Sequence, residues 1–181
     1  MNFKKSPIRC TRIDSVLGSI VLAATGHGLA GAWFERQRHW PDTRGWRPDD
    51  AHPVMREAAA QLTDYFAGRR RHFDLPLDLS HGTAFQQAVW QALLAIPMGR
   101  TTSYGALSKN IGNPAAVRAV GAAVGRNPIS VIVPCHRVLG TDGSLTGYAG
   151  GLARKSALLS LEGVRQVRQL AAAASPAEVA R

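Results

Sequence analysis

The spacing of apolar residues changes from strand-like to helix-like near residue 80, and this change most limits how the chain can fold. Before residue 35, apolar and β-branched residues come in short runs separated by glycines such as Gly18, Gly26 and Gly28. After residue 80, apolar residues recur three and four positions apart, which is typical of amphipathic helices. We therefore predict an α/β (α+β) protein, with a small N-terminal α/β domain containing an antiparallel sheet, followed by a mostly helical C-terminal domain.

The predicted N-terminal domain covers residues 1–79 and combines strands with one helix. The predicted strands cover residues 8–15, 18–25, 28–34 and 73–79. Residues 36–53 have no clear period, so we expect a long exposed loop there. A helix is predicted over residues 54–67 because apolar side chains fall near helical spacing, at Val54, Ala58, Leu62 and Phe66.

The predicted C-terminal domain covers residues 80–165 and is built mainly from helices. The predicted helices cover residues 83–96, 103–111, 114–125 and 152–161. The middle two are short and are joined by a tight turn at Gly112, which predicts a helix-turn-helix. A β-rich run at residues 130–133 predicts a short strand ending at Pro134, and the Ala-rich residues 166–181 predict a frayed tail.

The second helix of this pair consists almost entirely of small residues. Residues 114–123 include Ala115, Ala119 and Gly121, and Arg118 is their one long side chain. Small side chains allow a helix backbone to approach another surface closely. That surface is either the interior of the protein or a nucleic-acid groove probed by Arg118, and a helix-turn-helix pattern alone does not decide between them.

The positive charge of the chain gathers in its second part. The chain carries a net charge of +10, and residues 80–165 hold eight basic residues against Asp142 and Glu162. A basic segment with so few acids favours a polyanion as partner, although a basic protein without such a partner remains an alternative. No apolar stretch follows Lys4 and Lys5, and no run approaches the roughly 18 residues that cross a bilayer. We expect a cytoplasmic protein without membrane contact.

The most specific chemical feature is a cysteine followed directly by a histidine and an arginine. Cys135 comes after the β-rich run and Pro134, and is followed by His136 and Arg137. An imidazole or a nearby positive charge converts a thiol into the reactive thiolate, so we expect an ionised, reachable sulfur. Neighbouring side chains in a strand point apart, so His136 reaches Cys135 only through a turn or a bridging water. Of the two acids in this part, Glu162 is the better candidate to orient the imidazole.

These residues belong to a longer ordered series of motifs. The series resembles the O6-alkylguanine-DNA alkyltransferases, or methylated-DNA–protein-cysteine methyltransferases, in their stand-alone bacterial form. The resemblance covers residues 83–163 and is carried by Asn127-Pro128, Val133–Val138, Gly147–Gly151, Lys155, Leu158-Leu159 and Glu162-Gly163. The first part of the chain matches only in general pattern.

The resemblance implies DNA repair by direct reversal. The alkyl group of O6-alkylguanine, and that of O4-alkylthymine, would pass from duplex DNA to Cys135. His136 would be the base, acting through a water, and Glu162 would orient it. Tyr104 would turn the target phosphate and donate a proton to guanine N3, and Asn127 would be the hinge between the helix-turn-helix and the active site. The product is a thioether, which no group here could hydrolyse, so we expect one turnover per molecule.

The resemblance also implies how the DNA is held. The small-residue helix, with Ala115, Ala119 and Gly121, would lie in the minor groove, and Arg118 would enter the duplex where the flipped nucleotide left. Tyr148 would wall the pocket. The backbone groups of Cys135, Val138 and Ala149 would read the guanine edge. Many relatives have Ser where Ala149 stands, and we expect the smaller side chain to admit larger adducts.

The resemblance leads us to expect no cofactor and no metal. Some family members bind zinc near the N-terminus through Cys and His, but Cys10 has no companion cysteine here. We expect a monomer and leave cooperative binding along DNA open.

Three other functions compete with alkyl transfer. A damage sensor of the same fold would replace the acceptor cysteine, which is present here. A helix-turn-helix transcription factor would carry polar base-reading side chains, which residues 114–125 mostly lack. A cysteine hydrolase using Cys135, His136 and Glu162 would need an oxyanion hole and would turn over repeatedly.

Overall fold

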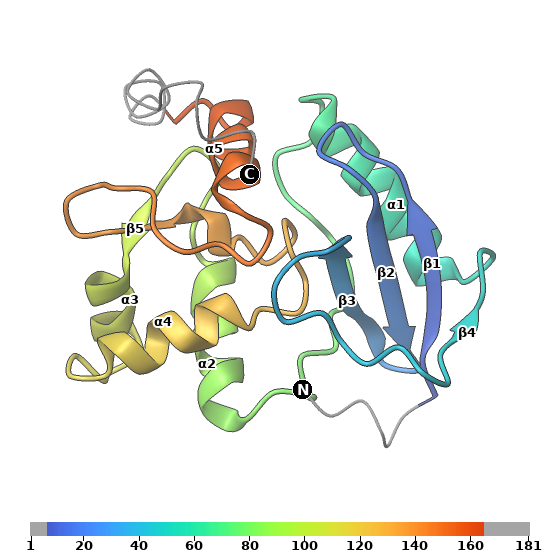
Figure 1. Cartoon of the computed structure of the whole chain (residues 1–181), viewed down its shortest axis with the longest axis horizontal. Helices are drawn as coiled ribbons and strands as arrows, with labels where there is room; N and C mark the ends of the chain where they lie inside the picture. The colour runs from blue at the N-terminus through green and yellow to red at the C-terminus, as the bar shows by residue number, and fades with distance from the viewer. Residues whose placement is uncertain (1–6, 165–181) are drawn as a thin grey trace.

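The computed structural model describes residues 7–164 and places a four-stranded sheet beside a group of helices (Figure 1). The sheet has the order β3-β2-β1-β4, and neighbouring strands run antiparallel except for β4, which is parallel to β1. Its strands are β1 (Arg9–Ile13), β2 (Ile20–Thr25), β3 (Gly28–Phe34) and β4 (Arg47–Pro48). The predicted antiparallel sheet is confirmed for the first three strands. The fourth is a two-residue strand inside the expected loop.

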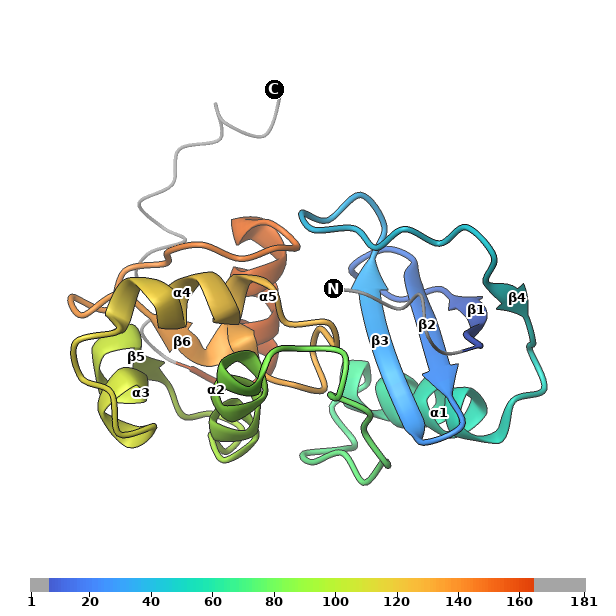
Figure 2. The ribbon, with the colours of Figure 1, turned by 90° about the horizontal axis from the view of Figure 1, so that it is seen from below.

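Helix α1 (Pro53–Phe66) covers one face of this sheet (Figure 2). Its fully buried apolar side chains are Met55, Ala58, Leu62 and Tyr65, and they pack into the same core as Leu22 and Leu29 of the sheet. The helix is confirmed, but its buried stripe is rotated from the predicted one. Val54 and Phe66 lie half-buried at the edges, and Tyr65 takes the position facing the core.

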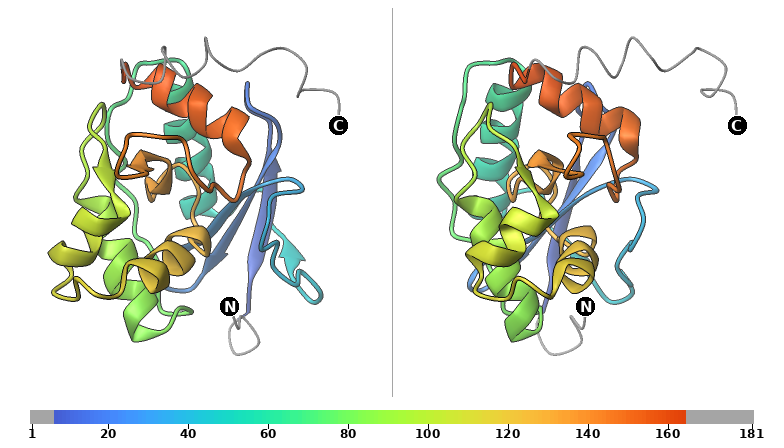
Figure 3. Two further views of the ribbon diagram at one scale, coloured as in Figure 1. Left: turned by 60° about the vertical axis from the view of Figure 1, so that its left-hand side comes forward. Right: turned by 90° about the vertical axis from the view of Figure 1, so that its left-hand side faces the viewer.

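The helical part begins at α2 (Ala84–Leu94), and α2, α3 and α4 form a group beside the strands (Figure 3). Thr83 caps α2 through a reciprocal capping box with Gln86, as its sequence favours. The other elements of this part are β5 (Thr102–Ser103), α3 (Tyr104–Asn110), α4 (Val117–Gly125), the 3₁₀ turn η1 (Cys135–Arg137), β6 (Val138–Leu139) and α5 (Leu152–Leu161). The four predicted helices are confirmed, although α4 begins at Val117 rather than at Pro114.

The predicted strands at residues 73–79 and 130–133 are wrong, and each segment instead makes one isolated bridge to β3 at or beside it. Residues 73–79 form a single bridge, Leu77 to Leu29, in which Leu29 N donates to Pro76 O and Asp78 N donates to Leu29 O. Residues 130–133 form turns, and only the preceding Ile129 bridges to Ala32. Residues 131–133 are β-branched and buried without extending a sheet, whereas residues 73–79 alternate half-buried apolar and exposed side chains but make only this one bridge.

The two parts share one hydrophobic core. A single cluster joins Phe34 and Met55 of the first part to Leu93, Val133 and Leu158 of the second. The structure therefore confirms the α/β architecture, and it shows that each part completes its core against the other. The predicted tail at 166–181 lies outside the described residues.

We predict that Gly28→Ala weakens the contact between β3 and residues 73–79, both of which belong to the N-terminal part. Gly28 has φ +145°, and a Cβ there would lie 2.4 Å from Pro76 O. The substitution is expected to lower the free energy of unfolding by about 1–3 kcal/mol, because it adds strain and a backbone clash. Urea unfolding followed by circular dichroism measures the loss. Gly26→Ala is the control, since nothing lies within 4 Å of its Cβ position. Equal stability of the two variants would contradict a close contact between Gly28 and Pro76.

Candidate functional site

Cys135 opens η1 at the end of a turn that Asn127 holds together. The Asn127 Nδ2 donates to Val133 O at 2.8 Å and lies 3.0 Å from Cys135 Sγ, while its Oδ1 accepts from Ile129 N at 3.0 Å. Cys135 therefore does not sit at the mouth of a strand, as the sequence predicted. One buried amide fixes the turn and supplies a donor to the sulfur.

The backbone of this turn has an unfavourable conformation at Val131. Val131 has φ +73°, which is unusual for a β-branched residue and strains the backbone. Ala32 N donates to Pro128 O at 2.9 Å and Ser130 N donates to Ala32 O at 2.8 Å, so β3 holds the segment that leads into the turn. The reactive turn is shaped by tertiary contacts rather than by local preference.

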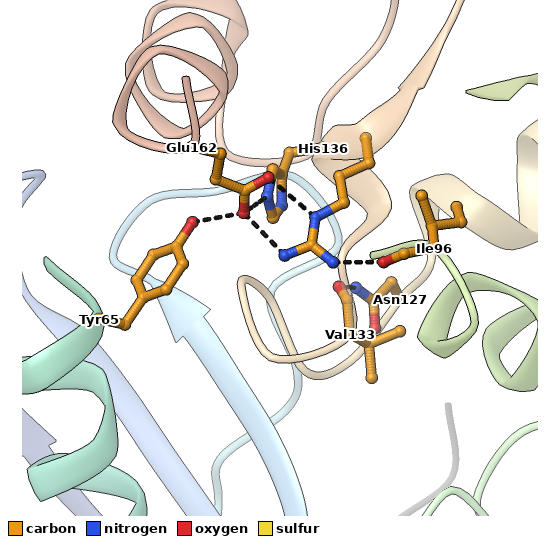
Figure 4. A network of polar contacts seen from close by, with 7 residues as sticks. Tyr65, Ile96, Asn127, Val133, His136 and Glu162 are labelled. Carbon is orange, nitrogen blue, oxygen red and sulfur yellow. Dashed lines mark hydrogen bonds and ion pairs between the residues drawn. The ribbon is translucent and has the colours of Figure 1, made fainter. Parts of the chain in front are cut away.

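Glu162, the C-cap of α5, accepts hydrogen bonds from His136, Arg137 and Tyr65 on one buried carboxylate. Figure 4 shows Tyr65 and His136 on either side of this carboxylate. Its Oε1 lies 2.8 Å from His136 Nε2, from Arg137 NH2 and from Tyr65 OH, and its Oε2 accepts from Arg137 Nε at 2.9 Å. The structure thus brings His136 and Glu162 together. The alternative acid, Asp142, is exposed and bonds only locally, to Ser144.

The protonation states of this network follow from its geometry. Burial alone would raise the pKa of Glu162, but hydrogen bonds from His136 and Arg137 outweigh burial and lower that pKa to about 2. Because the carboxylate is ionised, His136 Nε2 must carry the proton that it shares with Glu162. The pKa of His136 is lowered, chiefly by burial, so the imidazole is neutral at pH 7. Its Nδ1 then has a free lone pair, and this atom has no hydrogen-bond partner among the described residues.

The thiol of Cys135 is not the standing thiolate that the sequence suggested. Burial raises the pKa of Cys135, and the hydrogen bond from Asn127 and the charge of Lys155 only partly oppose it. Arg137, expected to supply positive charge to the sulfur, spends its donors on Glu162 and on Ile96 O. Cys135 exposes only 4% of its surface. At rest the sulfur is a covered, neutral thiol that needs a base.

Lys155 was not singled out as a site residue from the sequence, yet it lies in the site. It is fully buried, and its Nζ donates to Val138 O and Thr146 O, both at 2.6 Å. Burial lowers its pKa to about 8. Two signals were present in the sequence: Lys155 is among the residues that carry the family resemblance, and it is a lysine between Leu152 and Leu158 on an otherwise apolar helix face. The positive charge of Lys155 lowers the pKa of the Cys135 thiol and so partly offsets the effect of burial.

Tyr148 and Tyr104, both expected from the resemblance, lie close enough to the sulfur for a charge on it to act on them. Tyr148 is 8% exposed, and the pKa values of both Tyr148 and Tyr104 are raised, mainly by burial and further by a charge on Cys135. Tyr104 is half-buried, with its OH 3.4 Å from Gly147 O. The carbonyls of Cys135, Val138 and Ala149 each already accept one bond, from Val138 N, Lys155 Nζ and Arg38 N.

Helix α4 presents its small residues to solvent. Val120, Ala123 and Val124 face the core, whereas the predicted DNA-binding residues Ala115, Arg118 and Ala119 are exposed. Gly121 lies against Tyr104, since a Cβ there would be 3.8 Å from the tyrosine ring. Through Gly121, the exposed face of α4 therefore borders Tyr104.

Residues 7–164 contain no group of three His, Cys, Asp or Glu side chains placed to bind a metal ion. Within the same residues, no helix is long and apolar enough to cross a bilayer.

Fold and site together define a two-part protein whose helix-turn-helix adjoins a buried cysteine and a His–Glu pair. Residues 8–79 match the ribonuclease-like domain of 6-O-methylguanine DNA methyltransferase, and residues 84–164 match its DNA-binding domain. The chain therefore belongs to the 6-O-methylguanine DNA methyltransferase family.

Individual relatives agree with this family. The methylated-DNA–protein-cysteine methyltransferase of Mycobacterium leprae is 50% identical over 155 residues, which cover 86% of this chain and 92% of the relative. A crystal structure of Mycobacterium tuberculosis O6-methylguanine methyltransferase superposes with a TM-score of 0.78 at 50% identity, covering 86% of this chain and 92% of that one. A second M. tuberculosis structure, in complex with DNA, gives a TM-score of 0.79 at 46% identity, covering 90% of this chain and 98% of that one.

We predict that Glu162→Gln destabilises the protein in a pH-dependent way. The substitution leaves the buried Arg137 guanidinium without a counter-charge, so the free energy of unfolding at pH 7 should fall by about 3–5 kcal/mol. The folded pKa of Glu162 is about 2, below its ordinary value of 4.5. Its contribution is therefore complete above pH 4.5 and is lost as the pH falls toward 2. Urea unfolding at several pH values should show the gap between the two proteins narrowing in acid.

Asp142→Asn is the control for charge, because Asp142 is exposed and should affect stability little. The buried ion pair would be contradicted if the difference in the free energy of unfolding between Glu162→Gln and the natural protein stayed constant down to pH 2.

Proposed function

We propose that this protein repairs DNA by moving the alkyl group of O6-alkylguanine, and of O4-alkylthymine, from duplex DNA onto Cys135 in a single irreversible turnover. One observation carries the proposal. A buried thiol lies beside a His–Glu pair with a free acceptor nitrogen, next to a helix-turn-helix whose outer face is made of small residues. Family membership and the names of the relatives support the same activity.

The chemistry balances without a cofactor. The thiol proton passes through a water to His136 Nδ1, and Glu162 stabilises the imidazolium that forms. The thiolate then attacks the alkyl carbon, forming the C–S bond as the bond from carbon to O6 breaks. Tyr104 supplies a proton at guanine N3 and regains one from solvent, so guanine leaves neutral. The S-alkylcysteine is a thioether, and no step here reverses it.

The positions of the other pocket residues support this scheme. Asn127 holds the thiol turn and donates toward the sulfur, so it also stabilises the thiolate. Lys155 adds a positive charge nearby. Tyr148 would form a wall of the pocket. Backbone groups of Cys135, Val138 and Ala149 would read the guanine edge, with a backbone N–H as the donor to O6. Because Ala149 lacks a hydroxyl, we expect the pocket to accept larger adducts than a serine there would.

We propose that α4 binds the minor groove. A base buried in the stack must be flipped out before the sulfur can reach it, at a cost of a few kcal/mol. Ala115, Ala119 and Gly121 allow the helix backbone to approach closely, and Arg118 would fill the space left in the duplex. Because Cys135 is almost fully covered, the residues over it must also move when the base enters. We expect one monomer to act on each lesion in the cytoplasm, with cooperative binding left to experiment.

The alkyl-transfer experiment uses the only cysteine of one tryptic peptide. Cleavage after Arg126 and Arg137 releases residues 127–137, which contain Cys135 alone, while Cys10 falls in another peptide. After incubation with a duplex containing O6-methylguanine, mass spectrometry should find one added CH₂ on the first peptide and none on the second. The yield should stop at one methyl per protein molecule, even with excess DNA.

Cys135→Ser is the matched variant and should bind the duplex without removing the methyl group. An unmodified thiol with tight lesion binding would instead indicate a damage sensor. Repeated hydrolysis of an ester substrate would indicate a cysteine hydrolase.

We predict that Arg118→Ala separates base flipping from chemistry. Transfer from duplex DNA should slow about tenfold to a hundredfold, because the extrahelical state loses its filler. Transfer from the free base O6-benzylguanine needs no flipping and should stay within about twofold. Single-turnover kinetics with both substrates measure the split. Arg126→Ala, at the other end of α4, should only weaken DNA binding in a salt-dependent manner. Equal slowing on both substrates would rule out this role of Arg118.

A further inference from the structure

Tyr65 reaches from the N-terminal part into the site of the C-terminal part. It lies in the last turn of α1 and is fully buried, with its ring packed on Phe66 and Phe73 at centroid distances of 5.4 and 5.3 Å. Its hydroxyl donates to Glu162 Oε1 at 2.8 Å across 97 positions of sequence (Figure 4). Core packing accounts for the ring but does not require the hydroxyl.

The oxygen that Tyr65 contacts is the one that His136 uses. Oε1 of Glu162 accepts from Tyr65 OH, His136 Nε2 and Arg137 NH2, whereas Oε2 has only Arg137 Nε among the described residues. Donors on one carboxylate oxygen share its charge, so a stronger bond from one weakens the pull on the others. The tyrosine hydroxyl and the imidazole therefore compete for the same negative charge.

We propose that Tyr65 is a positioning residue for the alkyl transfer: its hydroxyl holds the Glu162 carboxylate in place and limits how strongly that carboxylate stabilises protonated His136. The inference rests on the proposed function, in which His136 accepts the thiol proton. It makes the N-terminal part a component of the reaction site and not only a support.

The other charged groups around His136 all come from the C-terminal part. They are Glu162 at the end of α5, Lys155 within α5 and Arg137 in η1, with the Cys135 thiol adjacent in sequence. Arg137 and Lys155 disfavour the imidazolium, and Glu162 favours it. Tyr65 acts on this balance only through Glu162, so removing its hydroxyl leaves the other groups in place.

Tyr65→Phe tests the role because it keeps the ring and removes only the hydroxyl. With one donor fewer, more of the Glu162 charge falls on His136, and the pKa of His136 should rise. The acid limb of the pH–rate profile for single-turnover transfer should therefore move to higher pH, while the rate at high pH stays within about threefold. The ring resonances of His136, titrated by NMR without substrate, should shift in the same direction. A purely structural role would lower stability without moving either midpoint.

Thr25→Val is the control for the loss of a buried hydroxyl. Thr25 donates to Asp78 at 2.6 Å within the N-terminal part, so its loss should reduce stability and leave both midpoints unchanged. Should Tyr65→Phe fail to fold, 3-fluorotyrosine at position 65 provides a second variant. Its more acidic hydroxyl is a stronger donor, and both midpoints should then move to lower pH.

Midpoints equal to those of the natural protein in the folded variants would overturn the role of Tyr65. Failure of the proposed function looks different, because the natural protein itself would then leave Cys135 unalkylated. In that case the NMR titration still decides whether Tyr65 tunes His136.

Discussion

The buried carboxylate of Glu162 is the constraint on which the site depends. Removing a carboxylate from water is expensive unless hydrogen bonds and an opposite charge replace the solvent. Here the replacement comes from α1 and η1, through Tyr65, His136 and Arg137, while α5 carries the carboxylate itself. Satisfying one anion therefore fixes the relative positions of three elements and the tautomer of the imidazole.

The pairing of Arg137 with Glu162 also explains why the Cys135 thiol is neutral. Arg137 is committed to Glu162, so the sulfur keeps only Asn127 and the more distant charge of Lys155 against the effect of burial. A neutral, covered thiol is a weak nucleophile and also a poor target for oxidation, which proceeds through the thiolate. In the proposed single-turnover reaction, each oxidation of the thiol would permanently inactivate one protein molecule. Reactivity that waits for the base and the substrate suits such a protein better than a permanent thiolate.

Sequence reasoning predicted the elements whose patterns are local. The helical spacing of apolar residues after Thr83 was sufficient to predict α2, and the glycines around the first strands defined β2 and β3. It failed at residues 73–79, where apolar and polar side chains alternate but only Leu77 bridges to β3, and at residues 130–133, where burial accounts for the β-branched composition without a strand. The positive φ of Val131 cannot be inferred from a β-branched residue, because tertiary hydrogen bonds impose it.

The site shows the same division between local and tertiary information. The family resemblance singled out Cys135, His136, Glu162 and Asn127, and in the structure Asn127 contacts the Cys135 sulfur and His136 contacts Glu162. The contribution of Tyr65 was invisible, because a tyrosine on the buried face of an amphipathic helix is indistinguishable in sequence from a residue that only packs. Lys155 carried two signals, as part of the family resemblance and as a lysine on an apolar helix, but its partners are backbone carbonyls that no motif specifies.

The N-terminal part acts on the site through the backbone as well as through Tyr65. Ala32 of β3 pairs with Pro128 and Ser130 at the start of the thiol turn, and Arg38 N donates to Ala149 O at 2.9 Å on the pocket segment. These bonds hold both the strained turn before Cys135 and the segment around Ala149. Without the N-terminal part, the C-terminal part would therefore lack hydrogen-bond partners that fix the turn carrying Cys135. A base that enters the pocket must displace residues held from both sides. The strained backbone at Val131 and the hydrogen bonds of the turn to β3 are thus parts of one arrangement that keeps the sulfur covered, and under the proposed function the free energy of DNA binding would have to expose it.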